Sequence, residues 1–373
     1  MKIIIKQNIL NDHLNNVIKG ISNKNIIPIL NCIKLSLTPE GLYLLSTDNE
    51  IAIKSFIPTK NIEEIIELGD IVVSGRLFHE IVKKLNGQII NIEELIDSKL
   101  SVYTNTSSFT LNCNDYNDFP ELDLNECKNP IIMSKKNFKT AIYQTIFATS
   151  TQESRPVLTG IDFNFSNNKL ECTATDSYRL AKKEILLNST LDQDYNIVIP
   201  TKNLSELIRM FNEDDDNFEL HIFENKIIFK FDSTIMLSRI INGTYPDTSK
   251  LIPNDFSLIM KVKLREFYNA IDRASLLTNE NDKNTIRFET KNGQAVISSN
   301  IPEIGYVEEN INIEKNNLEE LKIAFSSKYM LDALKSMDCD EIYLKFNGDI
   351  KPIIIKNTKN EDLLQLILPI RTY

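Results

Sequence analysis

Three stretches of the chain decide its fold: Val73-SGRLFHEIVKKL-Asn86, Ile199-PTKNLSELIRMF-Asn212 and Phe325-SSKYMLDALKSM-Asp338. Their first residues lie 126 positions apart in both steps. Each stretch has an apolar residue, two small or turn residues, a basic residue and then an amphipathic helical pattern with an acid at the eighth position. A repeat at a fixed spacing predicts several copies of one structural unit.

A second set of repeated segments opens each unit. Leu10, Leu14 and Val17 are spaced i, i+4 and i+7, which places them on one face of a helix. The matching residues later in the chain are Phe138, Ile142 and Thr145, and then Phe267, Ile271 and Ala274. Short strand-like runs at 2–7, 130–135 and 257–263 precede these segments. We therefore expect six helices, within residues 11–21, 75–86, 134–148, 201–212, 262–275 and 325–337.

A third repeat joins the first unit to the second. Pro28-Ile-Leu30 matches Pro156-Val-Leu158, and Thr47-Asp48 matches Thr175-Asp176, each 128 residues further on. Both pairs lead into alternating apolar and polar residues, the pattern of β-strands. The repeats together predict an α+β fold made of three copies of one domain, which cover residues 1–127, 128–252 and 253–373.

The composition is that of a soluble globular chain. Its 373 residues are 42% hydrophobic and 25% charged, and no apolar run approaches the roughly 20 residues of a membrane helix. The first residues, Met1-Lys-Ile-Ile-Ile-Lys6, are charged again too soon for a signal-peptide core. The five cysteines are scattered, with none at metal-ligand spacing, so we expect a reduced cytoplasmic protein.

Motifs for catalysis are missing from the sequence. The ten glycines form neither GxGxxG nor a phosphate-binding loop, and the three histidines lie in no metal-binding pattern. The acidic run Glu213-Asp-Asp-Asp216 follows a helical pattern and is flanked by asparagines, which favours a solvated loop over a magnesium site. We predict no catalytic residue, no metal site and no cofactor.

The charge of the expected helices differs from that of the whole chain. The six windows together carry a net charge of +8, whereas the chain carries −10. Helices favour glutamate as readily as lysine, so propensity alone does not explain the difference. A surface lined by helices and facing a polyanion does, because weak local charge permits loose phosphate contact without base recognition.

Five stretches carry a resemblance to a known family. They are Arg155-PVLT-Gly160, Thr173-ATDSYRL-Ala181, Tyr245-PDTSKLI-Pro253, Ile271-DRASL-Leu277 and Leu364-QLILPIRT-Tyr373. With these stretches in the family's order, the sequence resembles the bacterial sliding clamps, the beta subunits of the DNA polymerase III holoenzyme, over its whole length. The resemblance is greatest to the clamps of low-GC Gram-positive bacteria.

The resemblance implies an architecture and a function. Two chains of three clamp domains would join head to tail as a homodimeric ring, with helices lining the hole and sheets outside. The ring would encircle double-stranded DNA without reading its sequence, because topology holds it there. It would be a non-catalytic, cytoplasmic processivity factor that tethers the replicative polymerase alpha subunit, the clamp loader and other proteins with a clamp-binding motif, with no part in a membrane.

The resemblance also implies a peptide pocket, an interface and DNA contacts. By motif, the pocket residues are Leu158, Thr175, Ser177, Tyr178, Arg179, Leu180, Pro246, Lys250, Leu251, Ser326, Tyr329, Met330, Leu366, Leu368, Pro369, Ile370 and Arg371. Tyr178 and Lys250 stand where many relatives have His and Arg. The dimer interface would pair Phe109 and Leu111 of one chain with Leu276 and Leu277 of the other. The expected DNA-contacting residues are Lys24, Arg76, Gln152, Arg155 and Lys202.

Two other functions compete with the clamp. The edge Thr104–Ser108, which is basic in some relatives, is neutral here, while Glu303, Glu308 and Glu309 remain on the other side of the expected interface. A weakened interface would leave a scaffold that binds peptides but no longer closes on DNA. An enzyme that uses the acids of 213–216 is the third and weakest hypothesis.

Overall fold

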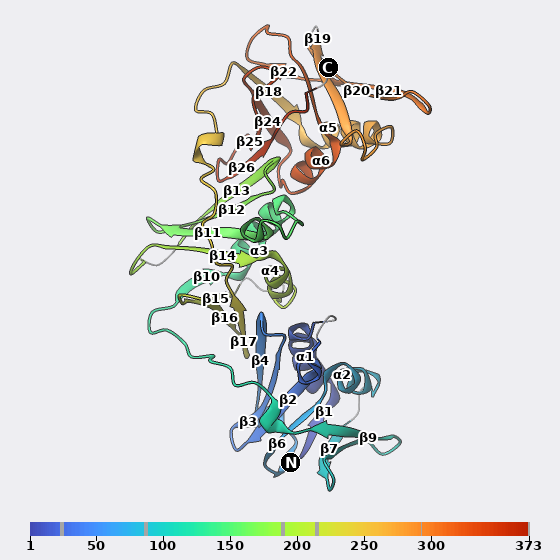
Figure 1. The fold of residues 1–373 in the computed structure, drawn as a ribbon, viewed down its shortest axis with the longest axis vertical. Helices are drawn as coiled ribbons and strands as arrows, with labels where there is room; N and C mark the ends of the chain where they lie inside the picture. The colour runs from blue at the N-terminus through green and yellow to red at the C-terminus, as the bar shows by residue number, and fades with distance from the viewer. Residues whose placement is uncertain (23–25, 86–88, 188–190, 213–215, 292, 372–373) are drawn as a thin grey trace. The chain divides into compact units, whose positions relative to one another are not determined.

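The computed structural model describes residues 1–22, 26–85, 89–187, 191–212, 216–291 and 293–371, which form two compact units (Figure 1). The first unit contains residues 1–135 and 202–240, and the second contains 136–201 and 241–373. The second predicted domain, 128–252, therefore contributes to both units. The expected acidic run falls largely outside the described residues, because 213–215 are not among them.

The first unit is built on one sheet of thirteen antiparallel strands. In sheet order these are β10 (Ile131–Ser134), β15 (Asn217–Ile222), β16 (Lys226–Phe231), β17 (Thr234–Arg239), β4 (Ile51–Pro58), β3 (Gly41–Thr47), β2 (Cys32–Thr38), β6 (Gly69–Ser74), β9 (Ser108–Asn114), β8 (Lys99–Tyr103), β7 (Ile89–Leu95), β1 (Lys2–Lys6) and β5 (Glu64–Glu67). The pairing of β17 with β4 joins the second sequence repeat to the first, with Thr234 opposite Ser55.

Helices α1 (Gln7–Val17) and α2 (Gly75–Lys84) lie side by side in the first unit (Figure 1). Leu10, Leu14 and Val17 are fully buried, which confirms the predicted apolar face of α1. The predicted window 11–21 was placed too late, because β1 ends at Lys6 and the helix begins at the next residue. The chain after Val17 tightens into a 3-10 turn.

The second unit contains two antiparallel sheets. The larger one has the order β14 (Tyr195–Pro200), β11 (Gly160–Ser166), β12 (Lys169–Thr175), β13 (Arg179–Leu186), β26 (Leu363–Ile367), β25 (Ile353–Asn357), β24 (Glu341–Phe346), β18 (Leu258–Lys263) and β22 (Glu314–Lys315). The smaller one has the order β21 (Gly305–Asn312), β20 (Gln294–Ile301), β19 (Thr285–Lys291) and β23 (Lys322–Ser326). The β13–β26 pairing joins the second repeat to the third.

The remaining helices are α3 (Lys135–Thr145), α4 (Thr201–Ile208), α5 (Leu264–Ser275) and α6 (Ser327–Lys335). Helices α2, α4 and α6 begin 126 residues apart, as the sequence repeat predicted. Within these bounds the six helices carry a net charge of only +5, of which α2 contributes +2 and α3 contributes +3. The basic excess is therefore smaller than predicted and concentrated in two helices. None of the described helices is long and apolar enough to cross a membrane.

The first Thr-Asp turn shows how the repeated dipeptide folds. Thr47 Oγ1 donates to the carbonyl oxygen of Ile51 (2.9 Å) and accepts from the amide of Asn49 (3.0 Å). Asp48 Oδ1 accepts from the amides of Glu50 and Ile51. Asn49 has a positive φ of 74°, which asparagine tolerates better than most residues do. The turn delivers the chain into β4.

Candidate functional site

The second Thr-Asp turn has the same hydrogen bonds as the first. Thr175 Oγ1 donates to the carbonyl oxygen of Arg179 (2.6 Å) and accepts from the amide of Ser177 (3.1 Å). Asp176 Oδ1 accepts from the amides of Tyr178 and Arg179. Ser177 takes the positive φ, at 78°. The turn presents Tyr178 to solvent with 60% of its surface exposed.

The side chain of Arg179 holds this turn against α6. Its Nε donates to Asp176 Oδ2 (2.9 Å) and its Nη1 donates to Asp332 Oδ2 (2.6 Å). The guanidinium carbon lies 4.5 Å from the ring centre of Tyr329 and 5.4 Å from that of Phe147. Two charge-assisted bonds and two ring contacts fix Arg179 as a structural cross-link.

Tyr245 supports the turn from beneath. Its hydroxyl oxygen accepts a hydrogen bond from the amide of Thr175 (3.0 Å). Burial raises the pKa of Tyr245, because the phenolate form would lose its solvation. Leu158 and Val198 pack beside the Tyr245 ring in a small buried cluster. The Tyr-Pro-Asp stretch thus places an anchor under the turn, while Pro246 is exposed.

Several predicted pocket residues are part of the core. Leu180 is 1% exposed and Leu366 is 2% exposed; they pack together with Ile354 and Leu364. Thr175, Ser326 and Met330 are also buried. A peptide laid on this surface would gain little by covering them, so they would act as the floor that supports the trough. Leu251, at the end of a 3-10 turn, is 47% exposed, and Lys250 beside it is exposed.

The C-terminal stretch is docked by backbone hydrogen bonds. After β26, the amide of Leu368 donates to the carbonyl oxygen of Tyr178 (2.9 Å), and the amide of Ile370 donates to that of Ala324 (2.7 Å). A chain end frays unless it is held in this way. Leu368, Pro369 and Ile370 are partly buried, and Arg371 is exposed.

A cavity of about 670 Å³ opens between this stretch, the Thr-Asp turn and α6. Its lining residues are Tyr178, Glu280, Lys283, Asn284, Ser326, Lys328, Tyr329, Leu368, Pro369, Ile370 and Arg371. Seven of the predicted pocket residues therefore meet at one cavity. Aromatic and aliphatic surfaces with a few charged groups at the rim suit an extended peptide.

Four lining residues were not predicted: Glu280, Lys283, Asn284 and Lys328. The first three lie between α5 and β19, in a stretch without a repeated motif. Lys328 was visible as the basic residue of the third repeated helix, where it was not assigned a role. Three cations and one acid line the cavity, so its charge favours an anionic ligand group.

The predicted interface residues differ in exposure. Phe109 and Leu111 point to the same side of β9, where Phe109 is 38% exposed and Leu111 is buried. Leu276, at the end of α5, is 80% exposed, and Leu277 is partly buried. Phe109 and Leu276 are thus the apolar side chains available to a partner chain.

Two of the acids near the predicted interface, Glu308 and Glu309, already have partners. Arg273 Nε and Nη2 donate to the two carboxylate oxygens of Glu309 (2.8 and 2.6 Å), and this pair lowers the pKa of Glu309. The hydroxyl of Tyr306 donates to Glu308 Oε2 (2.6 Å). An ion pair across an interface would have to compete with these contacts.

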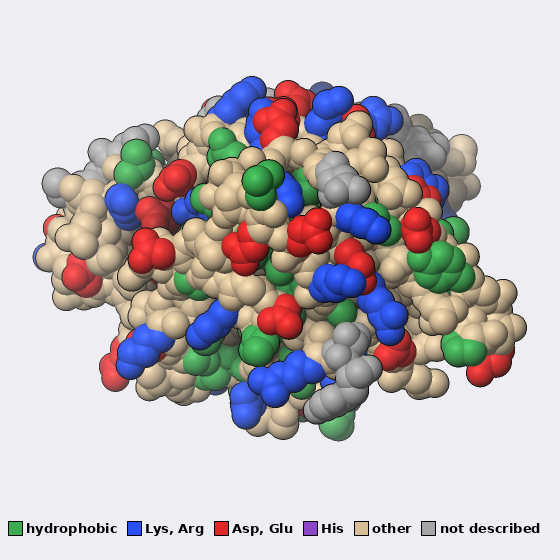
Figure 2. Space-filling model, turned by 90° about the horizontal axis from the view of Figure 1, so that it is seen from above, with side chains coloured by type: hydrophobic (Ala, Val, Ile, Leu, Met, Phe, Trp, Pro, Cys, Tyr) green, Lys and Arg blue, Asp and Glu red, His purple; other side chains and the backbone are tan. Residues whose placement is uncertain are grey.

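Some of the predicted DNA-contacting residues are exposed, and others already have hydrogen-bond partners. Lys24 lies outside the described residues. Arg76 Nη2 donates to the carbonyl oxygen of Ile21 (3.0 Å), and Lys202 Nζ donates to Asp48 Oδ2 (2.9 Å). Gln152 and Arg155 are exposed ahead of a short 3-10 turn. On the face that Figure 2 shows, which is seen from above, blue and red side chains are intermixed.

Comparison with protein families assigns all three parts of the chain. The model of the DNA polymerase III beta subunit N-terminal domain matches residues 1–123, the central-domain model matches 132–247, and the C-terminal-domain model matches 249–371. The chain belongs to the DNA polymerase III beta subunit family. Its α+β architecture of three clamp domains and the resemblance seen in the sequence are confirmed.

Individual relatives agree over their whole length. The beta sliding clamp of Bacillus subtilis is 39% identical over 378 residues, and that of Staphylococcus epidermidis is 38% identical over 377, with each chain covered completely. The crystal structure of the Bacillus subtilis clamp superposes on this chain with a TM-score of 0.95. The beta chain from Streptococcus pneumoniae is 32% identical and also superposes with a TM-score of 0.95. Each comparison covers both chains completely. The chain is a DNA sliding clamp, a processivity factor of replication rather than a catalytic subunit.

Proposed function

We propose that two copies of this chain close into a ring around double-stranded DNA in the cytoplasm, with domains 1–127, 128–252 and 253–373 in each chain. Family membership supports the ring, and the exposed side chains Phe109 and Leu276 support an apolar interface. Burying a leucine-sized side chain contributes roughly 1.5–3 kcal/mol, so a few such contacts hold a dimer with little help from charge. Leu111 and Leu277 would pack behind the two exposed residues.

The observation that carries the proposal is the docked C-terminal stretch beside the 670 Å³ cavity. We infer that this cavity takes an extended peptide from the replicative polymerase alpha subunit, the clamp loader or another protein with a clamp-binding motif. Leu368, Pro369 and Ile370 would contact apolar anchors of the peptide, while Tyr178 and Arg371 line the rim. The buried residues below them keep this surface in place.

DNA contact would fall to the exposed members of the predicted set. Gln152 and Arg155 have exposed side chains, whereas Arg76 and Lys202 must first leave their present partners. Lys24, which lies outside the described residues, is the fifth member of the predicted set. Such loose contacts suit a ring that slides, because tight phosphate binding would slow it.

Two measurements test the proposal: the mass of the protein in solution and its retention on circular DNA. The full chain should sediment as a dimer of twice 42.8 kDa at micromolar concentration. When loaded on nicked circular DNA it should remain bound after a high-salt wash, and cutting that DNA once should release it. A monomer at micromolar concentration, or equal retention on linear and circular DNA, contradicts the ring.

A scaffold that binds peptides without closing on DNA is the second candidate. The neutral edge at 104–108 and the pairing of Glu309 with Arg273 favour it, because both remove charge from the predicted interface. A monomer that still binds a clamp-motif peptide would identify this function, so one preparation distinguishes the two candidates.

A further inference from the structure

In the first unit, a cysteine lies next to a buried histidine. Neither of them is among the residues that line the peptide cavity. Cys127 lies in the irregular segment 119–130, and His221 lies on β15. The amide of Cys127 donates to His221 Nδ1 (3.1 Å), and Cys127 Sγ lies 3.2 Å from the same nitrogen. The thiol is therefore within hydrogen-bonding distance of a possible base.

The other ring nitrogen of His221 faces a carboxylate. His221 is 1% exposed, and its Nε2 makes no hydrogen bond among the described residues. The nearest acid is Glu219, whose Oε2 lies 3.3 Å from Nε2. Because Nδ1 accepts the amide hydrogen of Cys127, the ring proton belongs on Nε2, toward Glu219. Thiol, imidazole and carboxylate thus follow one another in the order that activates a nucleophile.

The same residues do not suit a metal ion as well as they suit a thiol site. Ligand atoms of Glu126, Glu219 and His221 lie within 4.8 Å of one another. The Nζ of Lys230, however, lies 2.7 Å from Glu126 Oε2 and 3.4 Å from Glu219 Oε2, where a cation would bind. A metal at Nε2 would also require the proton to move to Nδ1, against the amide of Cys127.

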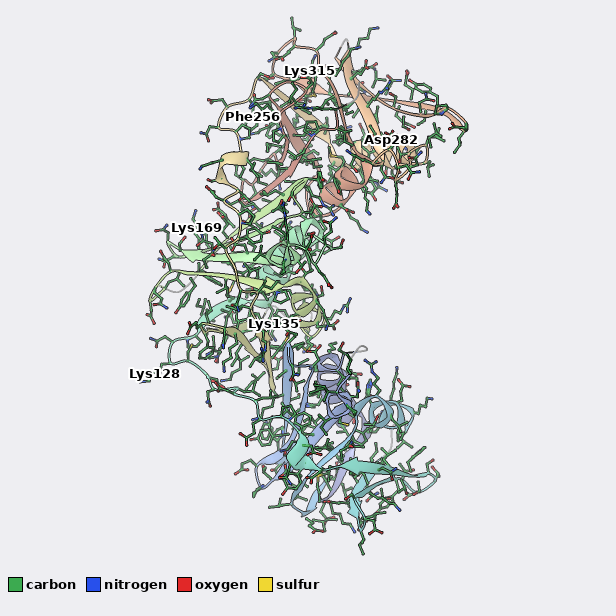
Figure 3. The ribbon with its side chains drawn as sticks, viewed as in Figure 1. Lys128, Lys135, Lys169, Phe256, Asp282 and Lys315 are labelled. Carbon is green, nitrogen blue, oxygen red and sulfur yellow. The ribbon has the colours of Figure 1, made fainter. Side chains whose placement is uncertain are left out.

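Two lysines of β16 form ion pairs with acids near the thiol. Lys230 pairs with Glu126 and Glu219, and hydrogen bonding to Glu126 raises the pKa of Lys230. Lys226 pairs with Asp123 of the segment (2.6 Å). Lys128 is exposed next to Cys127; Figure 3 labels it on the outer turn of the segment. The carboxylate of Glu219 is the group placed to stabilise a protonated His221.

The other four cysteines have environments that suppress reactivity. Burial raises the pKa of Cys32, Cys172 and Cys339, and it raises that of Cys113 to about 11. Cys127 is partly exposed, as Cys113 and Cys339 are, and its neighbours Glu126 and Lys128 are exposed. Among these three cysteines, Cys127 is the one with a histidine nitrogen beside its sulfur among the contacts of the described residues.

We propose that Cys127 is a nucleophilic thiol activated by His221, and that it forms mixed disulfides with low-molecular-weight disulfides. The thiol proton passes to His221 Nδ1, and the thiolate attacks one sulfur of the disulfide R–S–S–R. The Cys127–S–S–R bond forms, the original S–S bond breaks, and the leaving R–S⁻ takes up the proton from the imidazolium. One disulfide and one thiol give one disulfide and one thiol, so the electrons balance.

The reaction has a structural consequence for the segment. After the exchange His221 is neutral again, but the attached group R fills the space between the sulfur and the imidazole. The attached group therefore weakens the contact that ties Cys127 to β15. The thiolated chain should therefore lose protection of the Cys127 amide. This inference does not depend on the ring or on the peptide cavity.

The test uses the full-length native protein and an aromatic disulfide, 5,5′-dithiobis(2-nitrobenzoic acid), with the released thiolate followed by absorbance. One thiol per chain should react fast, and mass spectrometry of peptides should place the adduct on Cys127. Cys127→Ser should remove the fast phase, and the matched control Cys339→Ser should keep it. His221→Gln should slow the phase about tenfold at pH 7, and the difference should vanish near pH 10, where an ordinary thiol is ionised.

A second variant covers the case in which His221→Gln fails to fold. Glu219→Gln keeps the imidazole of His221 and removes the carboxylate beside it, so it should slow the fast phase at pH 7 and leave the rate near pH 10 unchanged. The proposal would be overturned by the absence of a fast thiol in the native chain, by a fast phase on another cysteine, or by equal rates in both variants and the native chain at pH 7. A fast phase that appears only after addition of a chelator would show a bound metal, and would overturn it as well.

Discussion

Removal of the last four residues, Ile370 to Tyr373, should weaken the binding of partner peptides strongly. The deletion takes away Ile370 and Arg371 from the cavity lining and with them the hydrogen bond from Ile370 N to the carbonyl oxygen of Ala324. Losing a partly buried isoleucine contact costs about 1.5 kcal/mol, and losing one backbone bond that orders Leu368 costs about 1 kcal/mol. Together these weaken binding roughly 50–100-fold.

The assay is fluorescence anisotropy of a labelled peptide with Leu and Phe anchors, titrated with each protein. Leu318→Ala is the matched control, because Leu318 is an apolar side chain that is 94% exposed and not among the residues lining the cavity. Sedimentation of both variants should still give the dimer, since neither change touches Phe109 or Leu276. If the truncated chain binds the peptide within threefold of the full chain, the assignment of the cavity is wrong, even though the clamp fold stands.

Three further results are expected. Burial raises the pKa of Asp162 to about 6, so the ionisation of this side chain destabilises the folded state as the pH rises from 4 to 6. Urea denaturation should therefore show that Asp162→Asn increases the free energy of unfolding by up to about 3 kcal/mol at pH 7.5 and hardly changes it at pH 4. Leu276→Lys combined with Leu277→Asp should give monomers in sedimentation, because burying unpaired charges costs on the order of 3 kcal/mol, and an unchanged dimer would refute the interface. Lys328→Glu should weaken an aspartate-containing peptide about fivefold at low salt, whereas Lys335→Glu at the far end of α6 should not; equal affinities would remove the cationic rim from the argument.

The sequence repeats predicted where most of the helices begin, but they did not predict how all the strands pair in the sheets. A spacing of 126 residues gave the starts of α2, α4 and α6, because in each copy the helix begins at the residue after the preceding strand ends. The sequence did not predict that β17 pairs with β4, since strands separated by more than a hundred residues leave no local signal of their partner. The α1 window was misplaced because the strand-to-helix change at Lys6 has no turn residue to mark it.

The motifs in the sequence predicted seven residues that line one cavity, but they did not predict which of the pocket residues are exposed. Motifs identified both Leu180 and Tyr178, yet one is 1% exposed and the other 60%, although they are two residues apart. Strand alternation predicts which side each faces only once the turn before it is known. Lys283 was missed because it reaches the cavity from a segment without a motif. The contact of Cys127 with His221 joins residues 94 positions apart, which no spacing rule detects.

The Thr-Asp turn occurs twice with the same backbone and different side chains. At the first turn, Asp48 Oδ2 binds Lys202, the basic residue that opens α4. The position that corresponds to Arg179 is Ile51, an apolar residue that enters β4 and leaves the carboxylate to the lysine. The first copy therefore uses its helix lysine in an internal ion pair.

At the second turn an arginine takes the lysine's place. Arg179 donates hydrogen bonds to Asp176 Oδ2 and to Asp332 Oδ2. The carboxylate of the second turn therefore has a cation beside it without the lysine of α6. Lys328, which corresponds to Lys202 at the 126-residue spacing, lines the cavity instead. The aspartate of the turn is thus bound by a lysine in the first copy and by an arginine in the second. The duplicated turn thus keeps its backbone hydrogen bonds in both copies, while the helix lysine pairs with the aspartate in the first copy and lines a cavity in the second.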